Sequence, residues 1–381
     1  MGTVNNISVF DDCFGCGVCY SVCPTKAIEM CENCDGFYRP KVKKDVCINC
    51  GKCLNVCSFA QKNVDNLSAI SAYSAWSSDT MTRLRSTSGG FIYELSQRFI
   101  EKGYKVIGVR FNVNSKRAEY YLIENNGDLL ASVGSKYAQA INYNVLRDID
   151  FNDKYLVVST PCTIASLSKA IPVDKRKNFI LVDFFCHGIP SYLMTDKYIR
   201  EIEHEIGPLR ELQFRSSDVG WQDSTTTKAI STNNEKLSQF SKGDVFYKMF
   251  LRNRCLAKCC YDDCRFKGEH SCADIRVGDF WGKRYGNSTD GINAVLVFTE
   301  AGEATIDDCQ GITLNIEQKS DILDGQLSAN PPRAKSYKYV TKALHTDKPL
   351  HSVSRNADII DFVRGGFYKK LKYYISRLTT K

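Results

Sequence analysis

The sequence predicts a small cysteine-rich module joined to a larger mixed α/β domain. Two cysteine strings of identical spacing lie within the first 62 residues, and a polar link rich in Asn and Ser, residues 61–71, follows them. Beyond the link, helical and strand patterns alternate. The length of 381 residues and the apolar content of 43% allow two or three domains with a sizeable core. We expect four segments, at residues 1–62, 71–150, 151–335 and 350–381.

Both cysteine strings separate three thiols by two residues each and add a fourth after three more residues. Three such thiolates can wrap one iron-sulfur cubane, while in two-cluster ferredoxins the fourth ligates the other cluster. The spacing therefore predicts two 4Fe-4S clusters with exchanged fourth ligands. The predicted ligand sets are Cys13, Cys16, Cys19 and Cys57 for the first cluster, and Cys47, Cys50, Cys53 and Cys23 for the second. Two zinc sites are the alternative, because thiolates at these spacings can also close a tetrahedral shell.

A module of this size buries too little apolar surface to fold on that basis alone, so we expect cluster ligation to stabilise it. Cys31 and Cys34 lie between the two strings and have no counterpart in the repeat. We leave this pair unassigned.

The elements after the link follow from hydrophobic periodicity. Residues 155–160, 162–170 and 178–186 are predicted as strand, helix and strand, a βαβ crossover in a sheet covered on both faces. Cys162 and Cys186 would then meet at the carboxyl edge of the sheet, where open α/β sheets place ligands. The other predicted elements are helices at 91–102 and 192–206 and strands at 105–111, 118–124, 211–215, 275–280 and 293–299.

A third group of cysteines follows in the second half of the chain. Burial as small apolar side chains is the alternative to a metal site, but charged residues such as Lys258, Asp262 and Arg265 surround the group and argue against a core. We expect a third 4Fe-4S cluster, with zinc as the second choice. The group comprises Cys255, Cys259, Cys260, Cys264 and Cys272, and the predicted ligands are Cys255, Cys260, Cys264 and Cys272.

The formal net charge of +8 is concentrated at the end of the chain, where six basic residues and no acidic residue follow Asp361. Apolar residues recur at helical spacing from Phe367 to Leu378, as in helices that lie on anionic membranes. A helix docked on its own domain is the alternative that we favour. We expect no nucleic-acid binding, because no recognised motif accompanies the charge. The sequence shows neither a signal-peptide core nor a membrane span, and we expect a cytoplasmic protein.

Six short motifs occur in order after the link, namely Ser86-Thr87-Ser88-Gly89-Gly90, Gly134-Ser135-Lys136-Tyr137, Thr160-Pro161-Cys162, Asp183-Phe184-Phe185-Cys186-His187-Gly188, Gly220-Trp221 and Ala273-Asp274-Ile275-Arg276-Val277-Gly278-Asp279-Phe280-Trp281-Gly282. Together they resemble the beta subunits of the deazaflavin-reducing (coenzyme F420) hydrogenases and formate dehydrogenases. The resemblance runs from about residue 71 to residue 333, with a ferredoxin-type module in front. It implies a mixed α/β flavoprotein domain.

The resemblance also implies FAD, held by three stretches of chain. Backbone amides at a helix start after Gly90 could hold its pyrophosphate. For that stretch alone a flexible helix start is the alternative. A Rossmann-type nucleotide site finds no support, because no G-x-G-x-x-G motif follows a strand. The flavin-facing residues that the resemblance implies are Ser88, Gly89, Gly90, Ser135, Lys136, Tyr137, Thr160, Pro161 and Cys162.

Two features depart from the family pattern. Thr163 stands where relatives usually have Gln, and the spacing from Cys260 to Cys264 is one residue longer than their knuckle. These departures leave the ligand set of the third group open. Many bacterial members belong to surface-polysaccharide gene clusters, where deazaflavin is not expected. The natural electron acceptor therefore does not follow from the resemblance.

Two residues are candidates for chemistry at the flavin. Cys162 at a helix start would have its thiolate stabilised by the helix dipole, as a redox thiol or a cluster ligand, with a buried structural cysteine as the alternative. His187 follows a strand end and could deliver a proton, because its ordinary pKa lies near neutrality. A histidine that only caps a turn is the alternative.

The sequence thus predicts an iron-sulfur flavoprotein oxidoreductase. Single electrons would enter through the two clusters of the module, pass the third cluster and combine in pairs at FAD, for exchange with an organic acceptor or a redox partner protein. A non-enzymatic electron-transfer subunit is the main alternative, and a zinc-stabilised scaffold is another.

Overall fold

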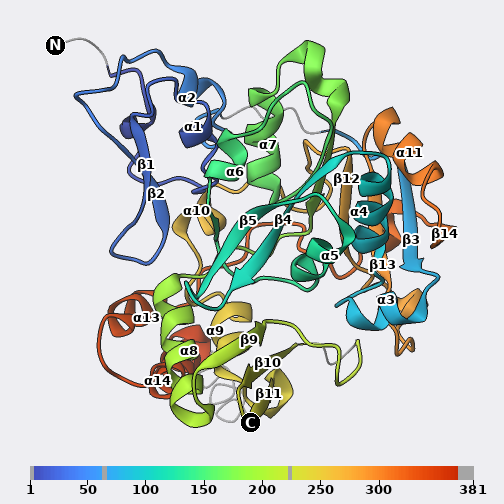
Figure 1. Cartoon of the computed structure of the whole chain (residues 1–381). Helices are drawn as coiled ribbons and strands as arrows, with labels where there is room; N and C mark the ends of the chain where they lie inside the picture. The colour runs from blue at the N-terminus through green and yellow to red at the C-terminus, as the bar shows by residue number, and fades with distance from the viewer. Residues whose placement is uncertain (1–3, 62–66, 222–224, 368–381) are drawn as a thin grey trace, which may run out of the picture.

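The computed structural model describes residues 4–61, 67–221 and 225–367 (Figure 1). The cysteine-rich module lies at one side of the larger domain and is built on an antiparallel hairpin of two strands, with short helices packed beside it. Its elements in chain order are η1 (Ile7–Val9), α1 (Val18–Ser21), β1 (Ile28–Glu32), β2 (Tyr38–Val42) and α2 (Lys52–Asn55).

Helices α1 and α2 each begin directly after a glycine of the repeated string. Gly17 has a φ of 77° and Gly51 a φ of 74°, in the left-handed region that favours glycine. A Cβ atom built on Gly17 would lie 1.9 Å from the ring of Tyr143 in the larger domain. The glycine beside the ligands therefore shapes the ligand loop and also lets the module approach its neighbour.

A nine-stranded mixed sheet organises the larger domain, with the strand order β14-β3-β13-β12-β8-β7-β4-β5-β6. Its strands are β3 (Ser71–Ser77), β4 (Lys105–Asn112), β5 (Arg117–Ile123), β6 (Ala140–Ile141), β7 (Tyr155–Val158), β8 (Phe179–Phe184), β12 (Ile275–Asp279), β13 (Asn293–Val297) and β14 (Ile312–Ile316). The helices packed around it are α3 (Thr80–Arg85), α4 (Phe91–Glu101), α5 (Asn126–Leu129), η2 (Leu130–Ser132), α6 (Asn144–Arg147), α7 (Pro161–Ala170), η3 (Val173–Asn178), η5 (Lys283–Tyr285), α11 (Glu300–Asp307) and α12 (Lys319–Leu323). Helix α10 (Lys258–Asp262) instead buries its side chains in a second apolar core.

Five strands of this sheet point the same way. β4, β7, β8 and β12 pair in parallel, so the predicted crossover through α7 is present. β3 shares their direction because β3 and β12 both pair antiparallel to β13. The carboxyl ends of these five strands therefore form one edge, the place where open α/β sheets bind ligands. We call it the carboxyl edge.

Apolar side chains cover both faces of the sheet. On one face α4 buries Phe91 and Leu95 against the strands. On the other face Ile164 of α7 packs in one cluster with Val18 and Val56 of the module. The module thus completes part of the core of the larger domain, which fixes its position.

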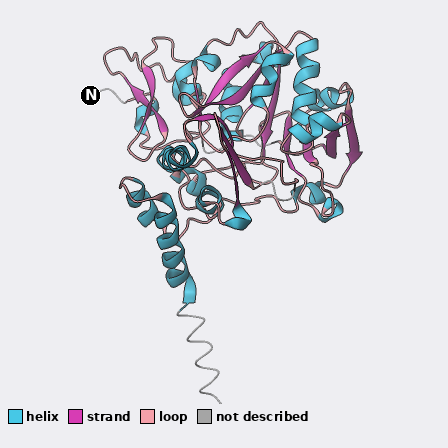
Figure 2. Cartoon of the chain, turned by 60° about the horizontal axis from the view of Figure 1, so that its bottom comes forward, coloured by secondary structure: helices cyan, strands magenta, loops and turns pink. Residues whose placement is uncertain are grey.

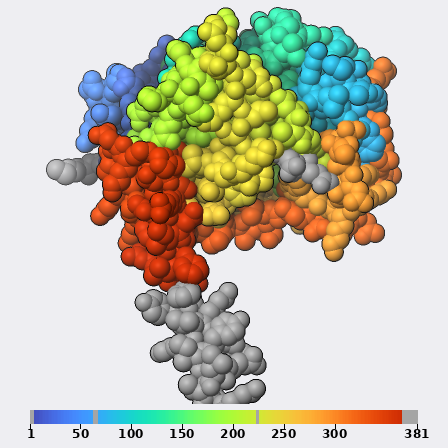
Figure 3. All heavy atoms as spheres, turned by 90° about the horizontal axis from the view of Figure 1, so that it is seen from below, coloured from blue at the N-terminus to red at the C-terminus, as the bar shows by residue number. Residues whose placement is uncertain are grey.

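A second, three-stranded antiparallel sheet lies beside the main one and forms a separate apolar core with the helices around it. The strand predicted over 211–215 belongs to this sheet, as β9. The C-terminal helices pack against this part of the molecule (Figure 3). Its elements are α8 (Tyr192–Ile206), β9 (Leu209–Gln213), β10 (Thr226–Ser231), β11 (Glu235–Gln239), η4 (Phe240–Lys242), α9 (Val245–Leu251), α13 (Tyr337–Leu344) and α14 (Leu350–Phe362).

At its C-terminal end α14 runs away from the body and continues as a short π-helical turn, Val363–Phe367 (Figure 2). The basic amphipathic helix predicted for the tail falls mainly on residues 368–381, outside the described residues, so it stays a prediction. Within the described parts of the chain, none of the helices combines the length and the apolar character that a bilayer crossing requires.

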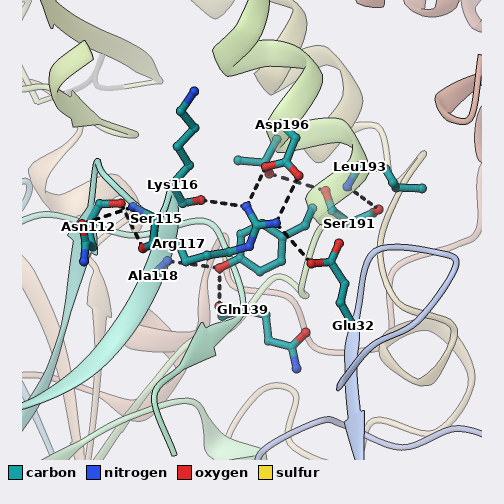
Figure 4. Close-up of polar contacts among 12 residues, drawn as sticks. Glu32, Asn112, Ser115, Lys116, Arg117, Ala118, Gln139, Ser191, Leu193 and Asp196 are labelled. Carbon is teal, nitrogen blue, oxygen red and sulfur yellow. Dashed lines mark hydrogen bonds and ion pairs between the residues drawn. The ribbon is translucent and has the colours of Figure 1, made fainter. Parts of the chain in front are cut away.

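Arg117 links the module to the larger domain at the start of β5 (Figure 4). Its guanidinium donates to Asp196 of α8 at 2.7 Å and to Glu32 of β1 at 3.1 Å, and it lies 4.1 Å from the ring centre of Tyr192. Ser191, the N-cap of α8, also donates to the backbone carbonyl of Asp35 at the hairpin tip. The hairpin is therefore held against the start of α8 by charge and by backbone hydrogen bonds.

Candidate redox site

The module contains two hollows, and each is lined by four cysteines from both repeats. The first hollow is lined by Cys13, Cys16, Cys19 and Cys57, together with Phe14, Phe59 and Ser166. The second is lined by Cys23, Cys47, Cys50 and Cys53. The structure thus brings together the two exchanged sets that the spacing predicts. Within the described residues, no three His, Cys, Asp or Glu side chains gather closely enough to hold a single metal ion.

The surroundings of these thiols fit iron-sulfur ligation. The backbone N–H of Gly15 donates to the sulfur of Cys13 at 3.3 Å, and that of Ala27 to the sulfur of Cys23 at 3.3 Å. Burial raises the pKa of Cys13 to about 12 and that of Cys57 to about 11. A buried thiolate is therefore unfavourable unless a cation binds it, and a cluster supplies that positive charge, while the N–H donors stabilise the bound sulfur.

A third thiol group lies at the carboxyl edge. Cys162 begins α7 after β7, Cys186 follows β8, and Cys260 lies in α10. Burial raises the pKa of Cys162, and Cys186 and Cys264 raise it further. Burial raises the pKa of Cys186 to about 11, and Cys260 and Cys264 act in the same direction. We call the four thiols that these segments bring to the carboxyl edge, Cys162, Cys186, Cys260 and Cys264, the third thiol group.

Local geometry explains how these segments meet. A Cβ atom built on Gly188, whose φ is 148°, would lie 3.4 Å from the Cβ of Cys260, so glycine permits the approach. Lys267 is 6% exposed, and its Nζ donates to the carbonyls of Cys186 and His187. Its charge opposes the rise in the pKa of Cys186. The group therefore has a buried cation beside it.

The other two cysteines of the sequence-predicted set lie differently. Cys255 is buried, and the groups that shift its pKa besides burial are the backbone of Ser191 and Arg254, not another thiol. Cys272 is half-buried and packs against the same apolar core as Cys264. The sequence-based ligand set does not include Cys186, which follows the predicted parallel strand.

The first hollow and the third thiol group adjoin each other through Ser58. Its hydroxyl donates to the carbonyl of Cys162 at 3.1 Å, and its own carbonyl accepts from Arg265 at 3.1 Å. Ser58 follows Cys57, and Arg265 follows Cys264. Among the thiols, the charge of Cys16 raises the pKa of Cys162 most. Two thiol groups from different parts of the chain are thus neighbours across the module boundary.

The stretch from Ser88 to Gly90 starts α4 beside the carboxyl edge. A Cβ atom on Gly89 would lie 2.4 Å from the carbonyl of Ala75 and 2.8 Å from the backbone nitrogen of Asn293. The side chain of Asn293 accepts from the N–H of Phe91 at 3.0 Å. Close packing against β3 and β13 accounts for the glycine at position 89, and one N–H of the helix start already has a partner.

The stretch from Gly134 to Tyr137 lies near the first one and reaches helix α9, which packs in the second apolar core. Gly134 faces Thr87, with 3.6 Å between its ideal Cβ position and the methyl group. Tyr137 packs on Phe250 with ring centres 4.9 Å apart. The Nζ of Lys136 donates to the carbonyls of Ser132 and Val133, so its ammonium turns back into its own loop.

Lys136 predicts a pH dependence of stability. Burial lowers the pKa of Lys136 to about 7, whereas in the unfolded chain it is about 10.4. Between these values the unfolded chain binds the additional proton, so the free energy of unfolding should rise with pH. Compared with Lys136→Met, the native protein should therefore gain stability from about pH 7 to about pH 9 in urea unfolding. An equal stability difference at both pH values would show that the folded-state pKa is ordinary.

The third flavin-facing stretch and the two catalytic candidates lie at the third thiol group. Thr160 is the N-cap of α7 with Pro161 in its first turn, and its hydroxyl lies 3.3 Å from the sulfur of Cys162. Burial raises the pKa of Cys162, which opposes the stabilisation of its thiolate expected from the helix dipole. The Nε2 of His187 lies 2.8 Å from Asn253, and burial lowers the pKa of His187, which fits a turn cap.

Arg215, which the sequence did not single out, joins two of the quoted motifs at this edge. Arg215 forms an ion pair with Asp279 at 2.5 Å, and the indole N–H of Trp221 donates to the same carboxylate at 2.9 Å. Trp221 stacks on Trp281 with ring centres 5.7 Å apart. The motifs Gly220-Trp221 and Asp279-Phe280-Trp281 thus meet around Arg215, which follows β9 of the second sheet. No local sequence pattern predicts this arginine.

Three family models match the chain. A 4Fe-4S dicluster domain matches residues 12–60, and the models for the N-terminal and C-terminal parts of the coenzyme F420 hydrogenase/dehydrogenase beta subunit match residues 72–147 and 152–321. The comparison with curated proteins found no match. Among solved structures, a chain of the F420-reducing NiFe hydrogenase complex from Methanosarcina barkeri is 14% identical with a TM-score of 0.49, over 79% of this chain and 92% of that chain. The two beta-subunit models together span well over half of the sequence, and the chain is an oxidoreductase-type member of the coenzyme F420 hydrogenase/dehydrogenase beta subunit family with a 4Fe-4S dicluster domain in front.

Proposed function

We propose that the protein is an iron-sulfur flavoenzyme in which electrons pass from the second hollow to the first, then to the third thiol group, and then to FAD at the carboxyl edge. The observation that carries this proposal is the contact through Ser58, which joins Cys57 of the first hollow to Cys162 and to the neighbour of Cys264. When bound, the clusters supply one-electron steps and the flavin pairs them for exchange with an organic molecule.

We propose four thiols as ligands of a third 4Fe-4S cluster. Cys162 and Cys186 replace Cys255 and Cys272 in the proposed set, because Gly188 brings the segment after β8 against Cys260. The charges of Cys186 and Cys264 also raise the pKa of Cys162, and those of Cys260 and Cys264 raise the pKa of Cys186. Ligands from two strand ends and one helix would place the cluster at the carboxyl edge, next to the flavin-facing stretches. In this set the other two ligands, Cys162 and Cys186, come from distant parts of the chain. Cys260 and Cys264 therefore need not form a tight two-residue knuckle, and the longer spacing between them is compatible with ligation.

A pair of variants tests this ligand set. Cys186→Ala should lose about one third of the iron and acid-labile sulfide, because a cubane rarely survives with three thiolates and no replacement. Cys255→Ala removes a buried thiol outside the group and should keep the full iron content. The measurement is iron and sulfide per chain after anaerobic purification. Iron loss in Cys255→Ala but not in Cys186→Ala would restore the original set.

The residues at the carboxyl edge support a flavin site of two parts. Backbone amides at the start of α4 offer donors for phosphate oxygens. The ion pair of Arg215 and Asp279, with Tyr137 beside it, offers polar groups next to aromatic side chains. These residues would bind and orient the isoalloxazine and keep water from it. We do not propose His187 as the proton donor, because its Nε2 is hydrogen-bonded to Asn253.

In this proposal the acceptor is an organic molecule or a partner protein, and the setting is surface-polysaccharide synthesis in the cytoplasm. The test is anaerobic reduction of the purified protein with a one-electron donor while cluster and flavin absorption are followed. Flavin bleaching that is slowed at least tenfold in Cys186→Ala would support the proposed route. Rapid reduction of a partner by protein that holds clusters but no flavin would instead favour the non-enzymatic electron-transfer subunit.

A further inference from the structure

Arg39 is a buried cation at the ligand loop of the first hollow. It lies in β2, and its side chain is 11% exposed. Its Nε donates to Asp12 at 2.8 Å, and its Nη1 donates to the carbonyl of Tyr38 at 3.0 Å. The same oxygen of Asp12 accepts the backbone N–H of Cys13 at 2.9 Å. The pair of Arg39 and Asp12 is therefore tied directly to the first ligand of the string.

The guanidinium reaches the space between two ligands. A Cβ atom built on Gly15 would lie 2.8 Å from its Nη1, and the N–H of Gly15 donates to the sulfur of Cys13. The side-chain nitrogen of Gln139, at 2.3 Å, and the carbonyl of Tyr38, at 2.5 Å, would lie closer still, so glycine, with a φ of 67°, leaves room for all three groups. The positive charge of Arg39 thus lies beside the loop from Cys13 to Cys16.

The same charge acts on thiols on both sides of the module boundary. Burial raises the pKa of Cys16, and Arg39 opposes that rise. Beyond the boundary, burial of Arg39 lowers its own pKa, but Cys13, Cys259 and Asp12 outweigh this effect and raise it. Arg39 consequently stands between the first hollow and α10, which carries Cys259 and a ligand of the third thiol group.

We propose that Arg39 is a positioning residue that raises the reduction potential of the first cluster, and that Asp12 limits this increase. Each electron received adds one negative charge to a site that four thiolates already make negative, and a buried cation stabilises that added charge strongly because solvent does not screen it. The second hollow is lined by Lys52, whose side chain is exposed and therefore screened. The arrangement favours transfer of an electron from the second cluster, which is oxidised, to the first, which is reduced.

This inference rests on the proposed clusters. Three variants test it through the midpoint potential of the first cluster, not through enzyme activity. Arg39→Gln should lower the midpoint potential of the first cluster, changing the ratio of reduced to oxidised sites at a given potential by roughly tenfold. Asp12→Asn keeps an acceptor oxygen but removes a negative charge, so it should shift the potential upward. Arg39→Lys should restore most of the native value. The measurement is a redox titration followed by electron paramagnetic resonance, with the first-cluster signal assigned from its loss in Cys16→Ala.

Arg117→Gln is the matched control, because it removes another cation of the module boundary that pairs with Glu32 and Asp196 and not with a ligand loop. It should leave the first-cluster potential unchanged. Shifts of Arg39→Gln and Asp12→Asn in the same direction, or an unchanged potential in either variant with full iron content, would overturn the inference. If Arg39→Gln loses the cluster, Asp12→Asn and Arg39→Lys still decide the sign. Native protein without iron would instead refute the proposed function.

Discussion

Cys23→Ala should destroy the cluster of the opposite cysteine string and leave intact the one that holds its sequence neighbours. Cys23 lines the second hollow with Cys47, Cys50 and Cys53, and the N–H of Ala27 donates to its sulfur. The first hollow takes its fourth cysteine from the other repeat, as Cys57. Loss of one of three clusters removes about one third of the iron, measured by iron and sulfide content together with the resonance signal of each cluster.

Cys31→Ala is the control for this experiment, because Cys31 is an exposed thiol of the same module and lines neither hollow. It should keep both signals and the native iron content. The exchanged ligation would be contradicted if Cys23→Ala and Cys16→Ala abolished the same signal while the second remained.

Asp183→Ala should lower the free energy of unfolding by about 3–5 kcal/mol, because it leaves a buried charge without its partner. Asp183 and Arg276 are both fully buried, and Asp183 accepts from Arg276 Nε at 2.6 Å and from Ser271 at 2.7 Å. Arg276 also donates to the carbonyls of Phe266 and Gly268. The pair therefore ties β8 and β12 to the segment that follows Cys264, so its loss should also loosen the third thiol group.

Urea unfolding followed by circular dichroism measures this loss, and Glu29→Ala is the matched control. Glu29 pairs with Lys43 on the module surface, where both side chains are about half exposed. Exposed pairs contribute little to stability. A stability of Asp183→Ala equal to that of Glu29→Ala would show that the segment rearranges and lets water reach Arg276.

Elements with a strong local signal were predictable from the sequence. The helix predicted over 192–206 is α8 with the same bounds, because its apolar stripe is regular and Ser191 caps its first turn. The crossover formed by β7, α7 and β8 was predictable from its continuous apolar strands. Strand β3 was not predicted, since it begins at the end of the polar link and alternates small and aromatic residues. Its place between β13 and β14 depends on pairing across more than two hundred residues.

The same contrast applies to the site. The two hollows follow from a repeat in which every ligand lies within a short stretch of chain. The third thiol group combines Cys162, Cys186 and α10, which the fold brings together only when β7 and β8 pair and Gly188 meets Cys260. Five cysteines within eighteen residues favour Cys255 and Cys272 in the sequence-based set. The variants Cys186→Ala and Cys255→Ala decide between that set and the proposed one. Arg39, Lys267 and Arg215 act by position in space, and no spacing in the sequence reveals them.

The central claim is that this chain combines iron-sulfur clusters with a flavin. Anaerobic purification followed by analysis of iron, acid-labile sulfide, zinc and flavin in the same sample tests it most directly. We predict iron and sulfide for three cubanes and one FAD per chain, with no stoichiometric zinc. Iron and sulfide for two cubanes without flavin would contradict the flavoenzyme and leave only the electron-transfer module, and stoichiometric zinc in place of iron would contradict the redox role altogether.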